Sequence, residues 1–569
     1  MKKALFIFIF LNSVISFSQG TSSTNNSFPV NYFENPMDIP LILSGTFAEL
    51  RPNHFHSGID IKTNQREGIE VFASAEGYVS RIKISHWGFG KAIYITHPNG
   101  YTTVYGHLQK LSDRLENFIK KEHYKNESFE VEVFPTATEL PVSKKELIAY
   151  SGRTGGFMPP HLHFEIRDTK TEETINPMYF GLNFSDTTKP KFNTLVGYSL
   201  DENSQINKVN SPVQLTLTKA SNGDLVANSI NAYGKIGFGI NAYDQLNAAP
   251  NQNGLYSLKV LVNGKQVHEF KASQFAFSES KLINLLIDFE RFKRIGQRIQ
   301  KCYNEPANTL SLTKNAVNNG IITIEDGLNY TIEIIASDFK NNEQKISIPI
   351  KGKKDVITGV KEDVKTPYFV KAKEVNEFSL RNAKVSFPAN TFYADLYLKF
   401  EVDDTSATVH NTTTIPINGY YTLTFDVSKY SEEEKNQLYI ASISGTKSNY
   451  ETTYKKGNSF YTSTKNLGKF TLLSDTKKPS ISLVNFKDEQ WITSLSSLKV
   501  KISDVGSGIK SYRAEIDGKW ILMEYDVINS TLTYDLRDAN YTEAKHVLKM
   551  VVIDSVGNLS TLESTFFRK

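Results

Sequence analysis

The sequence contains a single cysteine, Cys302, among 569 residues. An internal disulfide is therefore excluded, and the stability of the chain depends on packed cores. The neighbouring residues Lys301 and Tyr303 include no histidine that could act as a base. We expect a structural role for Cys302 rather than that of a catalytic thiol.

An excess of charge of one sign is also missing. The chain has 65 basic and 61 acidic side chains, which gives a formal net charge of +4. No clustered basic face is visible in the sequence, so nucleic acid is not an expected partner.

Long apolar runs are scarce. The one pronounced run, residues 4–17, follows the charged start Met1-Lys2-Lys3, and this pattern predicts a secretory signal peptide over residues 1–18. The run is shorter than the roughly 20 apolar residues of a membrane span and is interrupted by Asn12 and Ser13. We expect an exported mature protein with no transmembrane segment, in the periplasm as first choice and outside the cell as second.

The length exceeds what one hydrophobic core supports and predicts about three to five domains. Short strands are expected over residues 78–85, 92–97 and 101–107, the last two joined by the hairpin signal Pro98-Asn99-Gly100. After about residue 180 the composition becomes typical of β-sandwiches. The expected fold class is mainly β: an N-terminal antiparallel β-sheet domain followed by about three β-sandwich domains of the Ig-like type.

The second part of the chain contains an internal repeat. Its matching segments are Ser185-Asp186-Thr187-Thr188-Lys189-Pro190 with Ser474-Asp475-Thr476-Lys477-Lys478-Pro479, Val262-Asn263-Gly264-Lys265 with Ile516-Asp517-Gly518-Lys519, and Asp338-Asn341-Asn342 with Asp554-Gly557-Asn558. Each Asp-Thr-x-Lys-Pro segment predicts an extended joint, because the residue before proline avoids helix. We expect related Ig-like domains over residues 186–352 and 473–569, and a further β-sandwich without these markers over 365–472.

Two short motifs carry metal-binding side chains. In His56-Ser57-Gly58-Ile59-Asp60-Ile61, a strand would put His56 and Asp60 on one face, and in His161-Leu162-His163 two histidines share a face. A catalytic zinc site takes three protein ligands and leaves a fourth position for water. His56, Asp60 and one histidine of the later pair would fill this set. An isolated histidine on a strand is more often structural, but two such motifs in one small domain favour metal binding.

A third histidine, His107, stands at the end of a predicted strand, from which a side chain can reach an adjoining groove. For other residues near the motifs, the sequence predicts a role less specifically. We expect a supporting or structural role for His54, surface or strand-end positions for His86 and His97, a substrate contact or simple solvation for Glu49 and Arg51, and a groove wall or an ordinary strand position for Tyr105.

In this order, His-Ser-Gly-Ile-Asp, Tyr-Gly-His-Leu and His-Leu-His resemble the lysostaphin-type or LytM-type zinc endopeptidases, and Ser151-Gly152-Arg153-Thr154-Gly155 also fits them. The resemblance covers about residues 44–180 and implies a peptidase domain over 30–182, with the metal on the floor of a small antiparallel groove. It implies one zinc ion per chain. The implied zinc ligands are His56, Asp60 and His163, and the implied catalytic histidines are His107 and His161.

The resemblance implies a secreted hydrolase that cuts peptide bonds in the stem peptides or cross-links of bacterial peptidoglycan. The alternative is a non-catalytic LytM-like regulator that activates other cell-wall hydrolases, which the presence of all five site residues disfavours. A third hypothesis is that the β-sandwich part is a module that binds glycan or protein. This part contains no readable ligand-binding signature, so wall or protein contacts through it stay an open possibility.

The chain departs from the compact family pattern at one insertion, residues 109–140. Within it, residues 111–123 have the periodic apolar positions of a short helix. We expect this insertion to act as a lid or a groove wall that shapes the choice of substrate.

Overall fold

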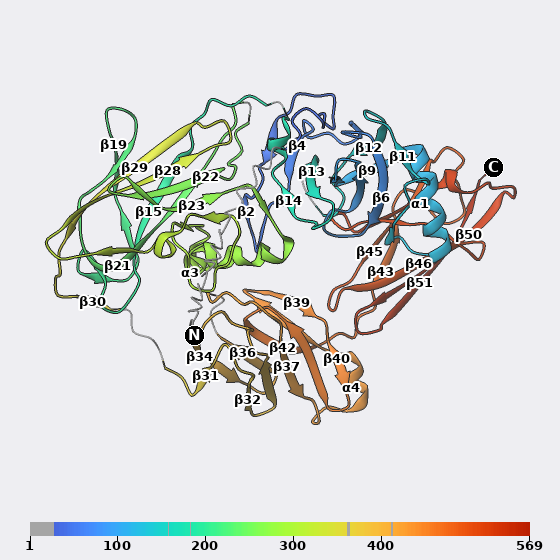
Figure 1. The fold of residues 1–569 in the computed structure, drawn as a ribbon. Helices are drawn as coiled ribbons and strands as arrows, with labels where there is room; N and C mark the ends of the chain where they lie inside the picture. The colour runs from blue at the N-terminus through green and yellow to red at the C-terminus, as the bar shows by residue number, and fades with distance from the viewer. Residues whose placement is uncertain are drawn as a thin grey trace, which may run out of the picture.

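The computed structural model describes residues 28–156, 159–182, 184–247, 249–360, 365–410 and 414–568. The predicted signal peptide, residues 1–18, lies outside the described residues. Strands make up 47% of the structure and helices 9%, so the prediction of a mainly β protein is confirmed. Figure 1 shows a first unit, before residue 183, between a second unit, residues 184–360, and a fourth unit, residues 475–568; the third unit is residues 365–474.

The first unit is built on an antiparallel sheet with the strand order β1-β4-β13-β8-β7-β6-β10, and a three-stranded sheet, β5-β12-β9, accompanies it. Aliphatic side chains from both sheets form its core. Its elements are β1 (Leu43–Gly45), β2 (Leu50–Arg51), β3 (His54–Phe55), β4 (Ile59–Lys62), β5 (Glu70–Phe72), β6 (Gly77–Ile84), β7 (Lys91–Thr96), β8 (Tyr101–Gly106), β9 (Leu108–Leu111), α1 (Asp113–Asn126), β10 (Val131–Val133), β11 (Pro141–Val142), β12 (Leu147–Ser151), β13 (His161–Asp168), β14 (Thr174–Ile175) and the 3-10 helix η1 (Pro177–Phe180).

The three strands predicted from the sequence correspond to β6, β7 and β8, each within one residue of the predicted bounds. Strand β13 lies between β4 and β8, and its register places His163 opposite Asp60 on one side and Gly106 on the other. Because β8 ends at Gly106, His107 begins the next turn beside this pair. The register of the central strand therefore brings all three sequence motifs together.

The second unit continues directly from the first. Strand β14 pairs with β24, and the side chains of Phe47 and Phe55 from the first unit pack into the core of the second. Its elements are β15 (Lys191–Ser199), β16 (Gln205–Ile206), β17 (Val209–Asn210), β18 (Val213–Leu215), β19 (Leu217–Lys219), β20 (Leu225–Ala227), β21 (Ile230–Tyr243), β22 (Ser257–Val262), β23 (Lys265–Lys271), β24 (Gln274–Phe275), η2 (Phe277–Leu282), α2 (Ile283–Leu286), α3 (Phe289–Ile295), β25 (Gln300–Lys301), β26 (Thr313–Lys314), η3 (Val317–Gly320), β27 (Ile322–Ile324), β28 (Asn329–Ser337), β29 (Glu343–Gly352) and β30 (Gly359–Val360).

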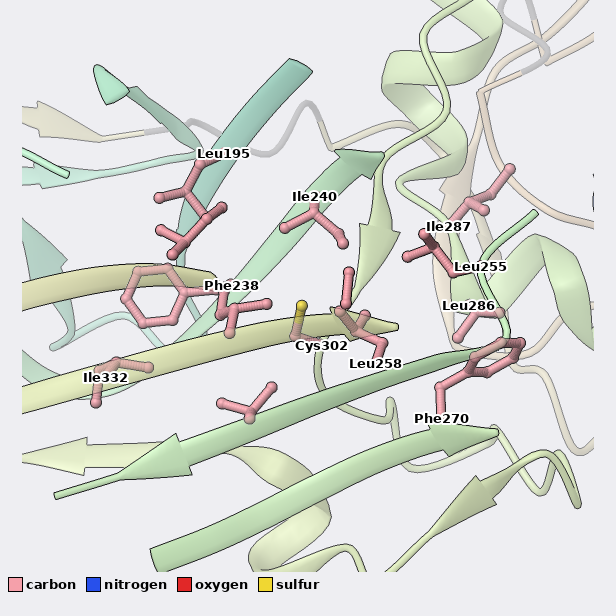
Figure 2. Packing of buried hydrophobic residues seen from close by; sticks show 14 of the residues in the cluster. Leu195, Phe238, Ile240, Leu255, Leu258, Phe270, Leu286, Ile287, Cys302 and Ile332 are labelled. Atoms are coloured by element: carbon pink, nitrogen blue, oxygen red, sulfur yellow. The ribbon is translucent and has the colours of Figure 1, made fainter. Parts of the chain in front are cut away.

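Cys302 lies inside the apolar core of the second unit (Figure 2), with 2% of its surface exposed. Burial raises the pKa of its thiol, which suppresses the reactive thiolate. These surroundings are those of a packing residue, as predicted from the sequence.

The third unit has two five-stranded sheets that enclose one core. Between residues 398 and 400 the chain leaves β34 and enters a different sheet at β35. Its elements are β31 (Tyr368–Val370), β32 (Asn376–Leu380), β33 (Ala383–Phe387), β34 (Leu396–Leu398), β35 (Phe400–Val402), β36 (Ser406–Val409), β37 (Tyr421–Asp426), α4 (Glu432–Gln437), β38 (Leu438–Ser444), β39 (Lys447–Glu451), β40 (Tyr454–Lys456), β41 (Ser459–Thr464) and β42 (Gly468–Ser474).

The fourth unit has a four-stranded and a five-stranded sheet around its own core. Its elements are β43 (Ser480–Leu483), β44 (Gln490–Trp491), β45 (Ser497–Ser503), β46 (Ile509–Ile516), β47 (Lys519–Trp520), β48 (Glu524–Asp526), β49 (Thr531–Asp535), η4 (Leu536–Asp538), β50 (Lys545–Asp554) and β51 (Leu559–Phe567). The repeated turns Asn263-Gly264 and Asp517-Gly518 both have positive φ angles and both close hairpins. The exact domain boundaries and the Ig-like type stay predictions.

The insertion after β9 forms the predicted helix, α1, over a slightly longer range than expected. One side of α1 buries Leu115 and Ile119 in the first unit. The other side contacts the fourth unit, where Lys120 forms an ion pair with Asp538 and Tyr124 packs on Trp520. Among the described residues, no helix combines the length and the apolar character that a membrane crossing requires.

Candidate metal centre

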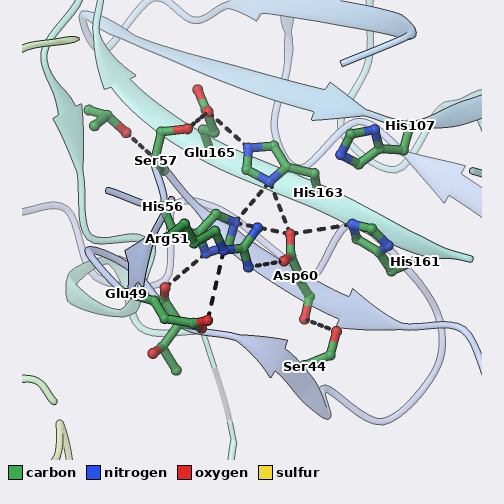
Figure 3. A network of polar contacts seen from close by, with 12 residues as sticks. Ser44, Glu49, Arg51, His56, Ser57, Asp60, His107, His161, His163 and Glu165 are labelled. Carbon is green, nitrogen blue, oxygen red and sulfur yellow. Dashed lines mark hydrogen bonds and ion pairs between the residues drawn. The ribbon is translucent and has the colours of Figure 1, made fainter. Parts of the chain in front are cut away.

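Three donor side chains of the two sequence motifs converge in the first unit (Figure 3). Asp60 Oδ1 lies 3.0 Å from both His56 Nε2 and His163 Nδ1, and these two nitrogens are 3.1 Å apart. All three side chains are buried. The expectation that His56 and Asp60 share one strand is wrong, because β4 starts only at Ile59. His56 instead precedes the strand, and the turn between them points its ring at Asp60.

Hydrogen bonds behind the two histidines fix which nitrogen faces the cluster. His56 Nδ1 donates to the carbonyl oxygen of Thr46 at 2.8 Å, and His163 Nε2 donates to Glu165 at 2.9 Å. With a proton held on the far nitrogen, the near nitrogen of each ring presents a lone pair. This is the arrangement that histidine ligands of metals adopt in proteins.

Glu165 is fully buried and also accepts hydrogen bonds from Ser57 and Arg167. Burial would raise its pKa, but the charges of Arg167 and His163 outweigh this and lower the pKa to about 2. Glu165 is therefore a carboxylate at neutral pH, and it can accept the proton of His163. Glu165 lies just beyond the motif His161-Leu162-His163, and the sequence alone assigned it no role.

Asp60 accepts a further hydrogen bond, from the guanidinium of Arg51 to Oδ2. In spite of burial, the charge of His56, the hydrogen bonds of His163 and His56 and the charge of Arg51 hold the pKa of Asp60 well below its usual range. Because Arg51 takes Oδ2, Oδ1 is the oxygen left to the cluster. Arg51 thus contacts a cluster residue directly, whereas the sequence left open whether it meets substrate or solvent.

The two remaining histidines lie side by side next to the cluster, with ring centroids 4.8 Å apart. His107 Nδ1 donates to the carbonyl oxygen of Thr154 at 2.9 Å, and His161 Nδ1 donates to that of Pro159 at 2.9 Å. His161 Nε2 is 3.6 Å from Asp60 Oδ1. Burial, with the neighbouring His163 and His161, lowers the pKa of His107 to about 3, so its ring is neutral near pH 7.

The other residues singled out from the sequence lie away from the cluster or behind it. His97 is buried and hydrogen-bonded to Glu76 and Thr103, so the expected surface position is wrong, although it does follow the end of β7. His54 is exposed, and His86 stacks on Phe129. Tyr105 is a buried strand aromatic. Phe89, which the sequence reasoning did not consider, stacks on the ring of His163 with centroids 4.8 Å apart.

The residues present fit a zinc ion. The three donor atoms lie within 4.8 Å of one another, and two imidazoles with one carboxylate are a frequent ligand set of catalytic zinc. Burial would lower the pKa of His163, but its hydrogen bonds to Asp60 and Glu165 raise the pKa to about 9. Without a cation the ring therefore holds a proton on Nδ1 as well, and a bound cation would take the place of that proton.

Such a set on an antiparallel sheet, beside two further histidines, could hold a metal ion and matches the ligand types of zinc hydrolases. The chain contains a peptidase M23 domain of the LytM and lysostaphin family. The family model described as Peptidase family M23 matches residues 54–124, which include His56, Asp60 and His107. A second model, described as a Zu5-like domain, matches residues 367–475 in the third unit.

Curated relatives match about a quarter of the chain. The DD-carboxypeptidase/endopeptidase Mpg of Neisseria meningitidis serogroup B is 31% identical over 134 residues, which are 24% of this chain and 24% of that protein. An uncharacterized metalloprotease of Haemophilus influenzae is 31% identical over 131 residues, which are 23% of this chain and 21% of that protein. The match therefore spans about a quarter of the length of these relatives.

Solved structures also match about a quarter of the chain. The catalytic domain of lysostaphin from Staphylococcus simulans has 22% identity and a TM-score of 0.19, and the match covers 25% of this chain and 91% of that one. The catalytic domain of the prophage-encoded M23 protein EnpA from Enterococcus faecalis has 19% identity and a TM-score of 0.19, with 26% and 95% covered. A SpoIIQ–SpoIIIAH pore forming complex has 21% identity and a TM-score of 0.20, with 26% and 90% covered.

Proposed function

We propose that this chain is a zinc metalloendopeptidase that hydrolyses peptide bonds in the stem peptides or cross-links of bacterial peptidoglycan. The observation that carries this proposal is the convergence of His56, Asp60 and His163, with the far nitrogen of each ring held by a hydrogen bond. The names of the curated relatives, a DD-carboxypeptidase/endopeptidase and a metalloprotease, support the substrate class.

In this proposal His56, Asp60 and His163 hold one zinc ion per chain. The ion would supply a Lewis acid that polarises the scissile carbonyl and makes a water molecule easier to deprotonate. Thr46 and Glu165 keep the ligand rings in the orientation that binding needs, and Arg51 restrains the carboxylate of Asp60. These contacts preorganise the site, which lowers the cost of closing it around substrate.

His107 and His161 would move the protons. Both rings carry a proton on Nδ1, where a carbonyl oxygen accepts it, so the neutral ring presents an unprotonated Nε2. One of the two would accept a proton from the attacking water, and the other would stabilise the oxyanion or protonate the leaving amine. The depressed pKa of His107 keeps this ring neutral, as a proton acceptor must be.

The experiment measures zinc content by elemental analysis and the release of new amino groups from purified peptidoglycan. The wild type should hold close to one zinc ion and release amines, His163→Ala should lose both, and His107→Ala should keep the zinc and lose activity by about 100-fold or more. The exposed His54→Gln is the matched control and should behave as wild type. A metal-free wild type that only stimulates other wall hydrolases would establish the regulator instead.

We further propose that the protein acts in the periplasm, with release outside the cell as the second choice. The apolar run after Met1-Lys2-Lys3 and the similarity to a DD-carboxypeptidase/endopeptidase support an exported protein. Cell fractionation with antibody detection tests this, and accumulation of the full-length chain in the cytosol would contradict it.

A further inference from the structure

Two triads of aspartates lie at corresponding places in the second and fourth units. One consists of Asp186, Asp244 and Asp338, the other of Asp475, Asp504 and Asp554, and within each triad the donor oxygens lie within 4.8 Å of one another. We propose that each triad binds one calcium ion, which fixes a joint between neighbouring units of the chain. This proposal does not depend on the peptidase function.

The first triad gathers one carboxylate from a joint and two from strand ends. Asp186 belongs to the extended segment between the first unit and β15, Asp244 directly follows β21, and Asp338 directly follows β28. All three are at least nine-tenths buried. A cation bound to them would therefore connect the linker to two strands that are far apart in sequence.

The carboxylates of the first triad lack a cationic partner, although Asp186 accepts a hydrogen bond from the backbone N–H of Thr188 and Asp338 accepts two from Asn342. Among the described residues, no Lys, Arg or His side chain forms an ion pair with Asp186, Asp244 or Asp338, and Asp244 Oδ1 has no hydrogen-bond partner at all although only 4% of the residue is exposed. A cavity of about 20 Å³ is lined by all three residues. This volume accommodates a single ion or water molecule.

The second triad repeats the arrangement with different neighbours. Asp475 directly follows β42 in the joint to the fourth unit, Asp504 directly follows β45, and Asp554 ends β50. Asp504 Oδ1 has no hydrogen-bond partner. Ser507 donates its backbone N–H to Asp475 Oδ2, and its hydroxyl is buried without a partner.

One asparagine supports each triad in the same way. Asn342 Nδ2 donates to Asp338 Oδ2 and to the carbonyl oxygen of Asp186, and Asn558 Nδ2 donates to Asp554 Oδ2 and to the carbonyl oxygen of Asp475. The same contacts thus occur twice, and the contact to the backbone carbonyl joins residues 156 positions apart in the second unit and 83 positions apart in the fourth. Repetition of the whole arrangement indicates a built site rather than a chance gathering of acids.

The chemistry of the donors selects the ion. Both triads offer only oxygen atoms, and calcium takes six to eight oxygen ligands at about 2.3–2.6 Å. Zinc prefers nitrogen and sulfur donors, as in the histidine cluster. Without a cation, burial and the charges of Asp186 and Asp338 raise the pKa of Asp244 to about 7, because three buried carboxylates repel one another.

The first triad also adjoins the metal centre. The cavity between its carboxylates is lined by Thr46 and Phe47 as well, and the carbonyl oxygen of Thr46 accepts the hydrogen bond of His56. Thr46 further exchanges hydrogen bonds with Gly254, a residue of the second unit. A calcium ion here would stiffen the segment that orients His56.

Calorimetric titration with CaCl₂ tests the proposal on the full-length chain, dialysed against EGTA and resupplied with one equivalent of zinc. The wild type should bind two calcium ions and gain at least about 3 °C in Tm. Asp244→Asn and Asp504→Asn should each bind one, and each variant serves as the control for the other. The half-buried Asp224 lies outside both triads, so Asp224→Asn should still bind two.

Three results would overturn the proposal: no calcium uptake by the wild type, uptake that both variants retain in full, or a wild type whose Tm ignores calcium and rises on mild acidification. The last result would show that each triad is satisfied by a shared proton. Because the titration follows calcium and not peptidoglycan cleavage, an inactive peptidase would leave the outcome readable.

Discussion

At the scale of single residues, Glu165 determines how His163 is presented. Its carboxylate accepts the Nε2 proton of His163, which leaves Nδ1 for the cluster, and Arg167 and Ser57 hold the carboxylate in place. Glu165 is two positions after His163 on β13, so both side chains lie on the same face of the strand. The strand thus supplies the ligand and its support together.

Replacing Glu165 with Gln should weaken zinc binding by about 10–100-fold, because the amide is a poorer acceptor and its NH₂ group opposes Arg167. Competition with a zinc-binding dye gives the affinity. Glu172→Gln is the matched control, since Glu172 pairs with the same Arg167 but is exposed. If Glu165→Gln and the wild type bind zinc with equal affinity, Glu165 does not orient His163 for metal binding.

The sequence predicts the side chains that converge but not those that support them. His56, Asp60, His107, His161 and His163 stand in short motifs whose spacing is readable. The acceptor of His56, by contrast, is a backbone carbonyl, and any residue type could have supplied it. Only the period-two spacing of Glu165 from His163 was a usable signal.

At the scale of secondary-structure elements, α1 links the first and fourth units. The helix presents Lys120 to Asp538, whose side chain is only 8% exposed, and Glu127 just beyond the helix pairs with Arg513 at 2.6 Å. These contacts give the insertion a docking role. The lid or groove-wall role expected from the sequence stays a prediction.

Lys120→Glu should therefore destabilise the docked fourth unit, since it places a like charge beside a nearly buried carboxylate, at a cost of about 1–3 kcal/mol. Lys120→Glu combined with Asp538→Lys should recover part of this loss. Limited proteolysis in the joint near residue 475 measures undocking. Lys121→Glu, on the exposed side of the same helix, is the control, and equal cleavage of both single variants would contradict the docking role.

Strand β24 makes the second inter-unit contact. Phe275 on this strand packs against Phe47 and Phe55 of the first unit, with ring centroids 5.4 and 5.6 Å away. Phe47 directly follows Thr46 in the sequence, and Phe55 directly precedes His56. The packing of the second unit thus reaches the metal centre through two side chains.

Phe275→Ala should lower the free energy of unfolding by about 3–5 kcal/mol, because it leaves a cavity in a packed core. It should also weaken zinc retention during dialysis, since the support of Thr46 is loosened. Phe134→Ala, at a 68% exposed position, controls for the loss of an aromatic ring. If Phe275→Ala loses stability but retains zinc as well as the wild type does, the packing of this core does not support the metal centre.

The alternation of apolar and polar residues predicts where strands occur, but it does not predict which strands of different units pair with one another. The hairpin turns at Asn263-Gly264 and Asp517-Gly518 follow from local residue preferences for positive φ. The pairing of β14 with β24 joins two-residue strands about a hundred positions apart, and such short strands leave no periodic pattern. Long-range register of this kind depends on the packed whole.

At the scale of the whole molecule, two other units brace the metal centre from different sides (Figure 1). The second unit supports the Thr46–His56 side, as argued above. On the other side, Glu524 of the fourth unit binds the buried Lys91, and the backbone N–H of Lys91 binds Thr154, whose carbonyl oxygen accepts from His107. The repeat predicts that the second and fourth units are related, but it does not predict this folding back of the fourth unit.

The stability of the whole chain should also depend on pH through the buried His268 on β23. Neither ring nitrogen has a hydrogen-bond partner, and burial lowers the pKa of this histidine to about 4. The unfolded chain titrates near pH 6.5 and so binds more protons between about pH 6.5 and 4. In this window acid stabilises the unfolded state, and His268 should cost up to about 3 kcal/mol as the pH falls.

Urea unfolding of wild type and His268→Leu from pH 7.5 to 4.5 isolates this effect, because the two aspartate triads titrate alike in both chains. The opposing titration of Asp244, whose pKa is raised to about 7, acts in the other direction and would mask His268 in the wild type alone. The difference between the two unfolding free energies should shift in favour of His268→Leu below about pH 6.5. A difference that stays constant over this range would show that His268 gains a proton as easily in the folded chain as in the unfolded one.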